Sequence, residues 1–233
     1  MFDNVRWAEV GFVADGITHL GNIPSCNNTP PKLLDICCGI GRMSNELARR
    51  GFVVTGVDIT EQYLQTARED AAHEKLNVEY INIDAREFKK TGYFDIAVNL
   101  YNSFGFFADQ KDDLLLVRNV YESLKPDGCF MIETVGKEIA VRDFTDGEWF
   151  ERAGFTVLTK YQPIDAWSIM KNKWILIKDG KRVEKEFTQR LYSAVELRAL
   201  LLEAGFKLIE IYGDWDESEY DINAAKLIVI GRK

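Results

Sequence analysis

One segment of the chain combines an acidic residue with closely spaced glycines. Residues 33–42 read LLDICCGIGR, so that an apolar run ends at Asp35 and leads through Gly39 and Gly41 into a helical stretch. A glycine has no side chain, and the backbone there can approach a ligand closely. In an open α/β sheet, ligands bind beyond the carboxyl ends of the strands, where turns of this kind gather. The segment therefore predicts a ligand-binding turn between a strand and a helix.

Two more acidic residues end β-rich runs further along the chain. Asp58 follows residues 52–57, and Asp84 follows residues 78–83. Either residue alone could be an ordinary helix cap or strand-end acid. Their position at the ends of successive predicted strands favours a shared role at one edge of the sheet.

The elements that must hold these residues are predicted by β-rich runs that alternate with amphipathic stretches. This alternation is typical of a parallel sheet covered by helices. The predicted strands are residues 32–36, 52–57, 78–83, 94–100, 129–134, 207–212 and 225–230. The predicted helices begin near Arg42, Thr60, Asp109 and Ser193, the last with a capping box. We expect an α/β fold with a doubly wound, mostly parallel seven-stranded sheet and helices on both faces.

A stretch of different character precedes the Ser193 helix. Four runs there have strand-like patterns: residues 155–162, 166–171, 174–178 and 182–192. Asp179-Gly180 is a strong signal for a two-residue hairpin turn. We expect an antiparallel β insertion over residues 155–192, lying over one end of the main sheet. Its aromatic residues could form a substrate lid or the interface of a homo-oligomer: Trp167, Trp174 and Tyr192.

The order of these motifs resembles the class I S-adenosylmethionine-dependent methyltransferases of the small-molecule type. The first motif of that family is acidic-x-Gly-x-Gly-x-Gly, and four residues here fall on its positions: Asp35, Cys37, Gly39 and Gly41, with Arg42 next. Cys37 departs from the first glycine, so the turn must suit a residue with a side chain. The resemblance covers residues 31–134, and residues 193–233 fit the family's last helix and strand pair. We expect residues 1–233 to form a single methyltransferase domain.

The resemblance implies S-adenosylmethionine as the cofactor and gives the other residues roles. Asp58 would bind the ribose hydroxyls, and Ile59 would lie against the adenine. Asp84, or the amide of Ala85, would recognise the edge of the adenine by hydrogen bonding. Residues 94–100 are similar to the fourth motif, whose end lies beside the reacting methyl group, and Asn99 stands near that end.

Methyl transfer makes few demands on acid–base chemistry. The leaving group is a neutral thioether, so the protein chiefly holds a nucleophile in line and excludes water. A general base is required only if the nucleophile is protonated. Tyr101 and Glu133 are the candidate catalytic residues, because they are polar and lie near the carboxyl ends of central strands; Glu133 could equally be a helix cap or a surface acid. Three further residues could form an aromatic wall or simply pack: Phe104, Phe106 and Phe107.

Composition narrows the classes of partner. The net charge is -8 and no long basic run occurs, which makes a nucleic-acid substrate unlikely on the sequence alone. No apolar run reaches the roughly 20 residues of a membrane span, and the start of the chain lacks the pattern of a secretory signal. The sequence therefore predicts a cytoplasmic enzyme with a small-molecule substrate and no membrane partner.

The cysteines do not form a metal-binding pattern. They are Cys26, Cys37, Cys38 and Cys129, without a CxxC pair and with only two histidines in the chain. The sequence predicts free, mostly buried thiols and no metal site.

Three other functions compete with this interpretation. A nicotinamide-dependent oxidoreductase shares the Gly-x-Gly pattern, but Ser44 stands where its third small residue belongs. A cofactor-binding fold without catalysis remains open, since a fold does not prove activity. A macromolecular methyltransferase also remains open, although residues 99–102 read NLYN rather than the Asn-Pro-Pro-Tyr of many nucleic-acid enzymes.

Overall fold

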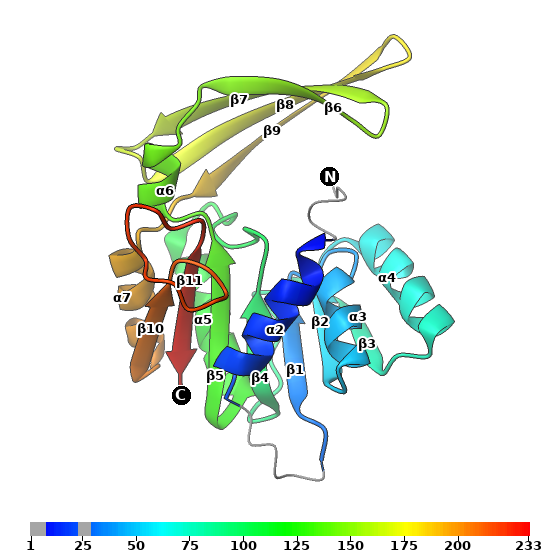
Figure 1. The fold of residues 1–233 in the computed structure, drawn as a ribbon, viewed down its shortest axis with the longest axis vertical. Helices are drawn as coiled ribbons and strands as arrows, with labels where there is room; N and C mark the ends of the chain where they lie inside the picture. The colour runs from blue at the N-terminus through cyan, green and yellow to red at the C-terminus, as the bar shows by residue number, and fades with distance from the viewer. Residues whose placement is uncertain (1–7, 23–28) are drawn as a thin grey trace.

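A computed structural model describes residues 8–22 and 29–233. Its main sheet has the strand order β10-β11-β5-β4-β1-β2-β3 (Figure 1). The strands are β1 (Lys32–Ile36), β2 (Val53–Asp58), β3 (Val78–Asn82), β4 (Phe94–Asn99), β5 (Leu124–Thr134), β10 (Leu208–Tyr212) and β11 (Leu227–Arg232). Strand β11 runs antiparallel to both neighbours, and the other pairings of the main sheet are parallel. The predicted seven-stranded α/β fold is confirmed.

Helices cover both faces of this sheet, because its strands are apolar on both sides. They are α2 (Val10–Leu20), α3 (Arg42–Arg49), α4 (Glu61–Glu74), α5 (Gln110–Ser123) and α7 (Ala194–Ala204); the short helix α6 (Lys137–Arg142) lies beyond the end of β5, next to the second sheet (Figure 1). Leu33 packs in the core under α2 and α3, whereas the next residue, Leu34, packs in the core under α5 and α7. Successive side chains of a strand point to opposite faces, and this alternation produces the two cores.

The caps of the later helices follow the predicted chemistry. The side chain of Asp109 accepts a hydrogen bond from the Lys111 amide at the start of α5. Ser193 and Glu196 form both bonds of a capping box at the start of α7, which Gly205 ends in a left-handed conformation. Helix α2 was not among the predicted elements, although the spacing of Val10, Val13 and Ile17 is helical.

A second, antiparallel sheet has the order β6-β7-β8-β9. It contains β6 (Gly147–Arg152), β7 (Phe155–Ile164), β8 (Ile169–Lys178) and β9 (Lys181–Arg190). It arches over the carboxyl ends of the central strands of the main sheet (Figure 1). The predicted β insertion is thus confirmed as an antiparallel sheet, and its Asp179-Gly180 hairpin has positive φ at both residues.

The strand limits of this sheet differ from those predicted. The predicted strands 166–171 and 174–178 are one continuous strand, β8, because the polar pair between them still pairs with both β7 and β9. Strand β6 was not predicted; it is a short segment without clear alternation that forms by pairing with β7. Such pairing depends on the partner strand, which local sequence does not reveal.

None of the helices in the described residues is long and apolar enough to cross a membrane, and the cytoplasmic location stays a prediction. No group of three His, Cys, Asp or Glu side chains in the same residues is placed to hold a metal ion. Cys37, Cys38 and Cys129 are free, and Cys26 lies outside the described residues.

Candidate functional site

A cavity of about 910 Å³ lies between the carboxyl ends of the main-sheet strands and the second sheet. Its lower wall comes from the turns after β1, β2, β3 and β4. Its upper wall comes from β8 and β9 of the second sheet, which contribute Trp174, Leu176, Lys185, Glu186 and Phe187. Residues more than a hundred positions apart in the chain therefore line one space.

Most of the residues selected from the sequence line this cavity. Eight of the ten proposed cofactor residues do so: Asp35, Cys37, Gly39, Arg42, Asp58, Ile59, Asp84 and Ala85. Tyr101 and all three phenylalanines of the following loop also line it. Gly41, Asn99 and Glu133 are not among the lining residues.

The turn after β1 is held by Asp58 from the neighbouring strand. Asp58 Oδ2 accepts a hydrogen bond from the Gly39 amide at 2.9 Å, and its Oδ1 accepts one from the Thr60 amide at 2.8 Å. Cys37 and Gly39 both have positive φ, 64° and 57°. Cys37 thus adopts the left-handed conformation that the family's glycine would adopt freely. Burial raises the pKa of the Cys37 thiol to about 12, so it is neutral near pH 7.

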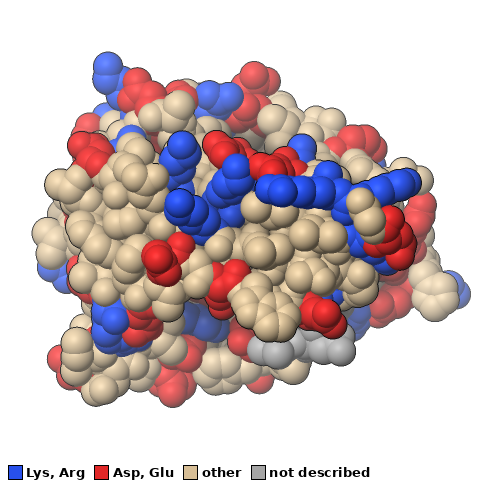
Figure 2. Space-filling model, turned by 90° about the horizontal axis from the view of Figure 1, so that it is seen from above, with Lys and Arg blue, Asp and Glu red and all other residues tan. Residues whose placement is uncertain are grey.

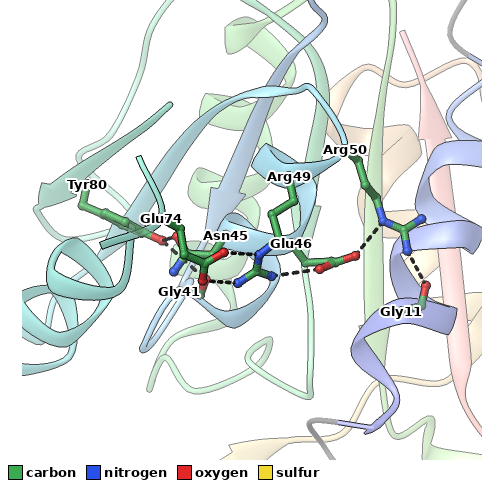
Figure 3. Close-up of polar contacts among 8 residues, drawn as sticks. All are labelled: Gly11, Gly41, Asn45, Glu46, Arg49, Arg50, Glu74 and Tyr80. Atoms are coloured by element: carbon green, nitrogen blue, oxygen red, sulfur yellow. Dashed lines mark hydrogen bonds and ion pairs between the residues drawn. The ribbon is translucent and has the colours of Figure 1, made fainter. Parts of the chain in front are cut away.

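Gly41 is required by packing inside the fold. A Cβ atom on Gly41 would lie 2.3 Å from the Tyr80 Oη and 2.7 Å from the Ala67 Cβ. Tyr80 reaches this position from β3 and donates a hydrogen bond to Asn45 Oδ1 at 2.8 Å (Figure 3). The Cβ position of Gly41 thus faces Tyr80, and contact of the Gly41 backbone with the cofactor stays a prediction.

Ion pairs and a hydrogen bond connect helix α3 to its neighbours and so hold the turn before it in position. Arg49 forms a bidentate pair with Glu74 of α4, with both N–O distances at 2.6 Å (Figure 3). Arg50 donates to Glu46 and to the carbonyl of Gly11 on α2. The helix that follows the glycine turn is thus connected to the elements on both of its sides.

Asp35 and Asp84 are acids in different environments. Asp35 is buried and accepts a hydrogen bond from the Ser44 hydroxyl at 2.6 Å. Burial raises the pKa of its carboxyl to about 6, against the opposing effect of that hydrogen bond. Asp84 is paired with Arg86, whose guanidinium also reaches Asp112. The hydrogen bonds from Arg86 hold the pKa of Asp84 below its ordinary value.

Asn99 and Glu133 lie near the carboxyl ends of β4 and β5, but their side chains do not line the cavity. Asn99 is fully buried and donates a hydrogen bond to the Ile36 carbonyl at 3.0 Å. Glu133 is 3% exposed and accepts a hydrogen bond from the Trp215 indole at 2.7 Å. Trp215 packs in the core under α2. The alternation along each strand has directed these two side chains onto the sheet faces instead of the edge that forms the cavity.

Hydrogen bonds connect the loop after β4 to the last residues of β9 in the second sheet. Tyr101 and Asn102 both have positive φ, and the Arg42 guanidinium lies 4.5 Å from the centre of the Tyr101 ring. The Gln189 amide group donates to the carbonyls of Asn102 and Phe104, and the Asn102 amide donates back to Gln189. Gln189 was not identified from the sequence, because its partners lie more than eighty residues away.

Aromatic rings continue from this loop onto the second sheet. Phe106 and Phe187 have ring centres 5.9 Å apart, and Phe187 and Trp174 have ring centres 6.4 Å apart. Asp113 of α5 also lines the cavity, and it is a fully buried acid that the sequence did not single out.

Comparisons with known proteins agree with this geometry. A family model described as "Methyltransferase domain" matches residues 33–128. The chain is 23% identical over 208 residues to the protein named "Putative methyltransferase YqeM" of Bacillus subtilis (strain 168), covering 87% of this chain and 84% of that one.

Two solved structures share the fold. The CcbJ methyltransferase from Streptomyces caelestis has a TM-score of 0.82 at 18% identity, covering 96% of this chain and 89% of its own. CalS10 from Micromonospora echinaspora, an amino pentose methyltransferase solved with S-adenosylmethionine bound, has a TM-score of 0.70 at 22% identity, covering 97% and 92%. Together with the family model and the strand-end residues, these matches give one assignment. They support a class I S-adenosylmethionine-dependent methyltransferase, with S-adenosylmethionine as its cofactor.

Proposed function

We propose that the protein transfers the methyl group of S-adenosylmethionine to a small molecule held between the loop after β4 and the second sheet. The observation that carries this proposal is the shared cavity, which is lined by the cofactor residues below and by β8 and β9 above. Its volume of about 910 Å³ is at the upper end of the range of about 300–1,000 Å³ occupied by small-molecule sites.

The residues at the lower wall fit the cofactor. Ile59 is an apolar side chain that is 68% exposed at the cavity, as expected for a residue that an adenine ring would cover. The Asp58 carboxylate beside it would accept hydrogen bonds from ribose hydroxyls. Gly39 would give the backbone close access to the ligand. When bound, the cofactor supplies an electrophilic methyl group, and the protein's part is to position the acceptor and exclude water.

The upper wall fits a small acceptor. Phe106, Phe187 and Trp174 form an almost continuous aromatic surface facing the cofactor residues. CalS10, the neighbour with the same fold, acts on an amino pentose, which is consistent with an acceptor of this size. Of the two candidate catalytic residues, Tyr101 lines the cavity, and we propose that it orients the acceptor.

The surface above the cavity offers little for a nucleic acid. Seen from above, Lys and Arg side chains lie beside Asp and Glu side chains (Figure 2). On the second sheet, Lys173 pairs with Glu184 and Glu186, and Arg182 pairs with Glu184. These pairs neutralise part of the positive charge that would otherwise replace the counterions of a phosphate backbone. A small molecule is therefore the acceptor class that we favour.

Trp174→Ala is expected to impair methyl transfer by about 30-fold or more in kcat/KM, the scale of losing a central aromatic contact. Affinity for S-adenosylhomocysteine should stay within about twofold. The measurement is transfer of labelled methyl from S-adenosylmethionine into a metabolite extract, with calorimetry for S-adenosylhomocysteine.

Trp149→Ala is the matched control for this prediction. Trp149 is 71% exposed, and its register with Leu158 and Ile175 places it on the opposite face of the same sheet. Its removal should leave both readouts unchanged. Equal losses of methyl transfer in the two variants would contradict an acceptor site on the face of the second sheet that carries Trp174.

Cofactor affinity is expected to weaken by up to about tenfold per pH unit as the pH falls below about 6. S-adenosylmethionine carries positive charge on its sulfonium and amino groups, and Asp35, with its pKa of about 6, loses its negative charge in this range. Calorimetry as a function of pH measures the effect. Asp35→Asn should bind weakly with a flat profile, and an unchanged slope in that variant would assign the titration to another group.

The folding stability of the cofactor-free protein should depend on pH in the opposite sense: it should fall as the pH rises. A carboxyl whose pKa is raised in the folded state binds its proton more tightly than in the unfolded chain. Its contribution to stability is therefore complete below the ordinary pKa of 3.8 and is lost as the pH rises through about 6. Thermal scans should show stabilisation by the cofactor growing over this window.

A further inference from the structure

Asp113 is a buried acid at the wall of the cavity. It lies in the first turn of α5, has no exposed surface, and lines the cavity together with Gly105 and Phe107. Its Oδ2 accepts a hydrogen bond from the Tyr192 hydroxyl at 2.8 Å. No hydrogen bond of normal geometry reaches its Oδ1 from the described residues. One oxygen of this buried carboxylate thus lacks a hydrogen bond of normal geometry.

The nearest cation does not satisfy this carboxylate. The Arg190 Nε lies 3.9 Å from Oδ2 and makes no hydrogen bond of normal geometry within the described residues. An ion pair that served only to hold the structure would be expected at about 2.7–2.9 Å with direct N–H donation. A buried carboxylate is costly unless its oxygens are bonded. The incomplete pairing therefore points to a third group that donates to Oδ1.

The electrostatics of the cavity indicate the charge of that group. The cofactor wall takes Asp35, Asp58 and Asp84. The acids left to face the acceptor are Asp113 and Glu186, against one base of the upper wall, Lys185. Aromatic faces also attract cations, and the walls contribute Phe104, Phe106, Phe107, Trp174 and Phe187. An acidic acceptor would be repelled here, and a cationic one would be attracted.

We propose that the acceptor is an amine, and that its nitrogen donates to Asp113 Oδ1; this inference rests on the small-molecule function proposed above. The acceptor enters as an ammonium ion, and Asp113 takes one of its protons. The freed nitrogen lone pair forms the new C–N bond, the methyl carbon–sulfur bond breaks, and its electron pair remains on the sulfur. The product leaves as an N-methylammonium ion.

The acidity of Asp113 is consistent with this role. Burial raises the pKa of Asp113 to about 6, against the opposing effects of the Tyr192 hydroxyl, Arg190 and the Gly105 amide, while Asp112 adds to the rise. Asp113 is therefore ionised near pH 7 and holds a proton more tightly than an ordinary aspartate.

The first experiment identifies the methylated atom. The protein is incubated with S-adenosylmethionine labelled in its methyl group and with the low-molecular-weight fraction of a metabolite extract, and labelled products are analysed by NMR. Label on nitrogen is expected. Label on oxygen, carbon or sulfur would overturn the amine inference and leave the small-molecule function intact. No labelled small molecule, or label only in macromolecules, would overturn the proposed function, and the inference with it.

The second experiment separates a chemical role of Asp113 from a structural one. With S-adenosylmethionine saturating at every pH, Asp113→Asn should lower kcat/KM for the labelled acceptor by about tenfold to a hundredfold and remove the decline of activity below about pH 6. Its affinity for S-adenosylhomocysteine should not change. Tyr192→Phe removes the hydrogen bond to Asp113 but keeps the carboxylate. This variant should therefore retain most of the activity and still lose activity as the pH falls below about 6. Equal losses of kcat/KM in both variants would overturn the proposal. So would a decline of activity below about pH 6 that is unchanged in Asp113→Asn.

Discussion

Replacing Gly41 by alanine is expected to lower the free energy of unfolding by about 3 kcal/mol or more. The residue has φ of 73°, a conformation that costs an L-residue roughly 1–2 kcal/mol. The new Cβ would also lie 2.3 Å from the Tyr80 hydroxyl and 2.7 Å from the Ala67 Cβ. Tyr80 must then move and lose its hydrogen bond to Asn45, which adds about 1–3 kcal/mol for overpacking and the lost bond. Urea denaturation measures the loss.

Gly92→Ala is the matched control for this variant. Gly92 also has positive φ, 60°, but a Cβ there would meet nothing within 4 Å. Only the conformational cost of about 1 kcal/mol should remain. If the two alanine variants lose the same stability, the contact with Tyr80 is not what selects glycine at position 41.

Asp58→Ala is expected to weaken S-adenosylhomocysteine binding by about 1.5–3 kcal/mol, or roughly tenfold to more than a hundredfold. Asp58 lines the cavity and holds the amides of Gly39 and Thr60. The variant therefore loses both an acceptor for the ligand's hydroxyls and the bond that fixes the Gly39 turn. Calorimetry on the folded variant provides the measurement.

Asp70→Ala on the exposed face of α4 controls for the loss of one negative charge. It should bind S-adenosylhomocysteine like the unmodified protein. Asp58→Asn, which keeps one acceptor oxygen, should fall between the two alanine variants. Unchanged affinity in folded Asp58→Ala would exclude this carboxylate from the cofactor site.

The sequence by itself determined the elements of the main sheet and most of the lower wall of the cavity. Asp35, Asp58 and Asp84 could be placed because each ends or follows a β-rich run, and parallel strands bring their carboxyl ends to one edge. Helix starts were equally local, since the capping side chains of Asp109 and Ser193 bond to amides two or three residues away.

Only the tertiary structure decided where side chains point and which distant residues meet. Asn99 and Glu133 lie near the ends of β4 and β5, but the pleat turns their side chains onto the sheet faces. Gly41 is required by Tyr80, which lies 39 positions away. Asp113 contacts Tyr192, 79 positions away, because α5 packs against the segment that follows β9. Contacts of this kind follow from the relative positions of whole elements, which local residue patterns do not encode.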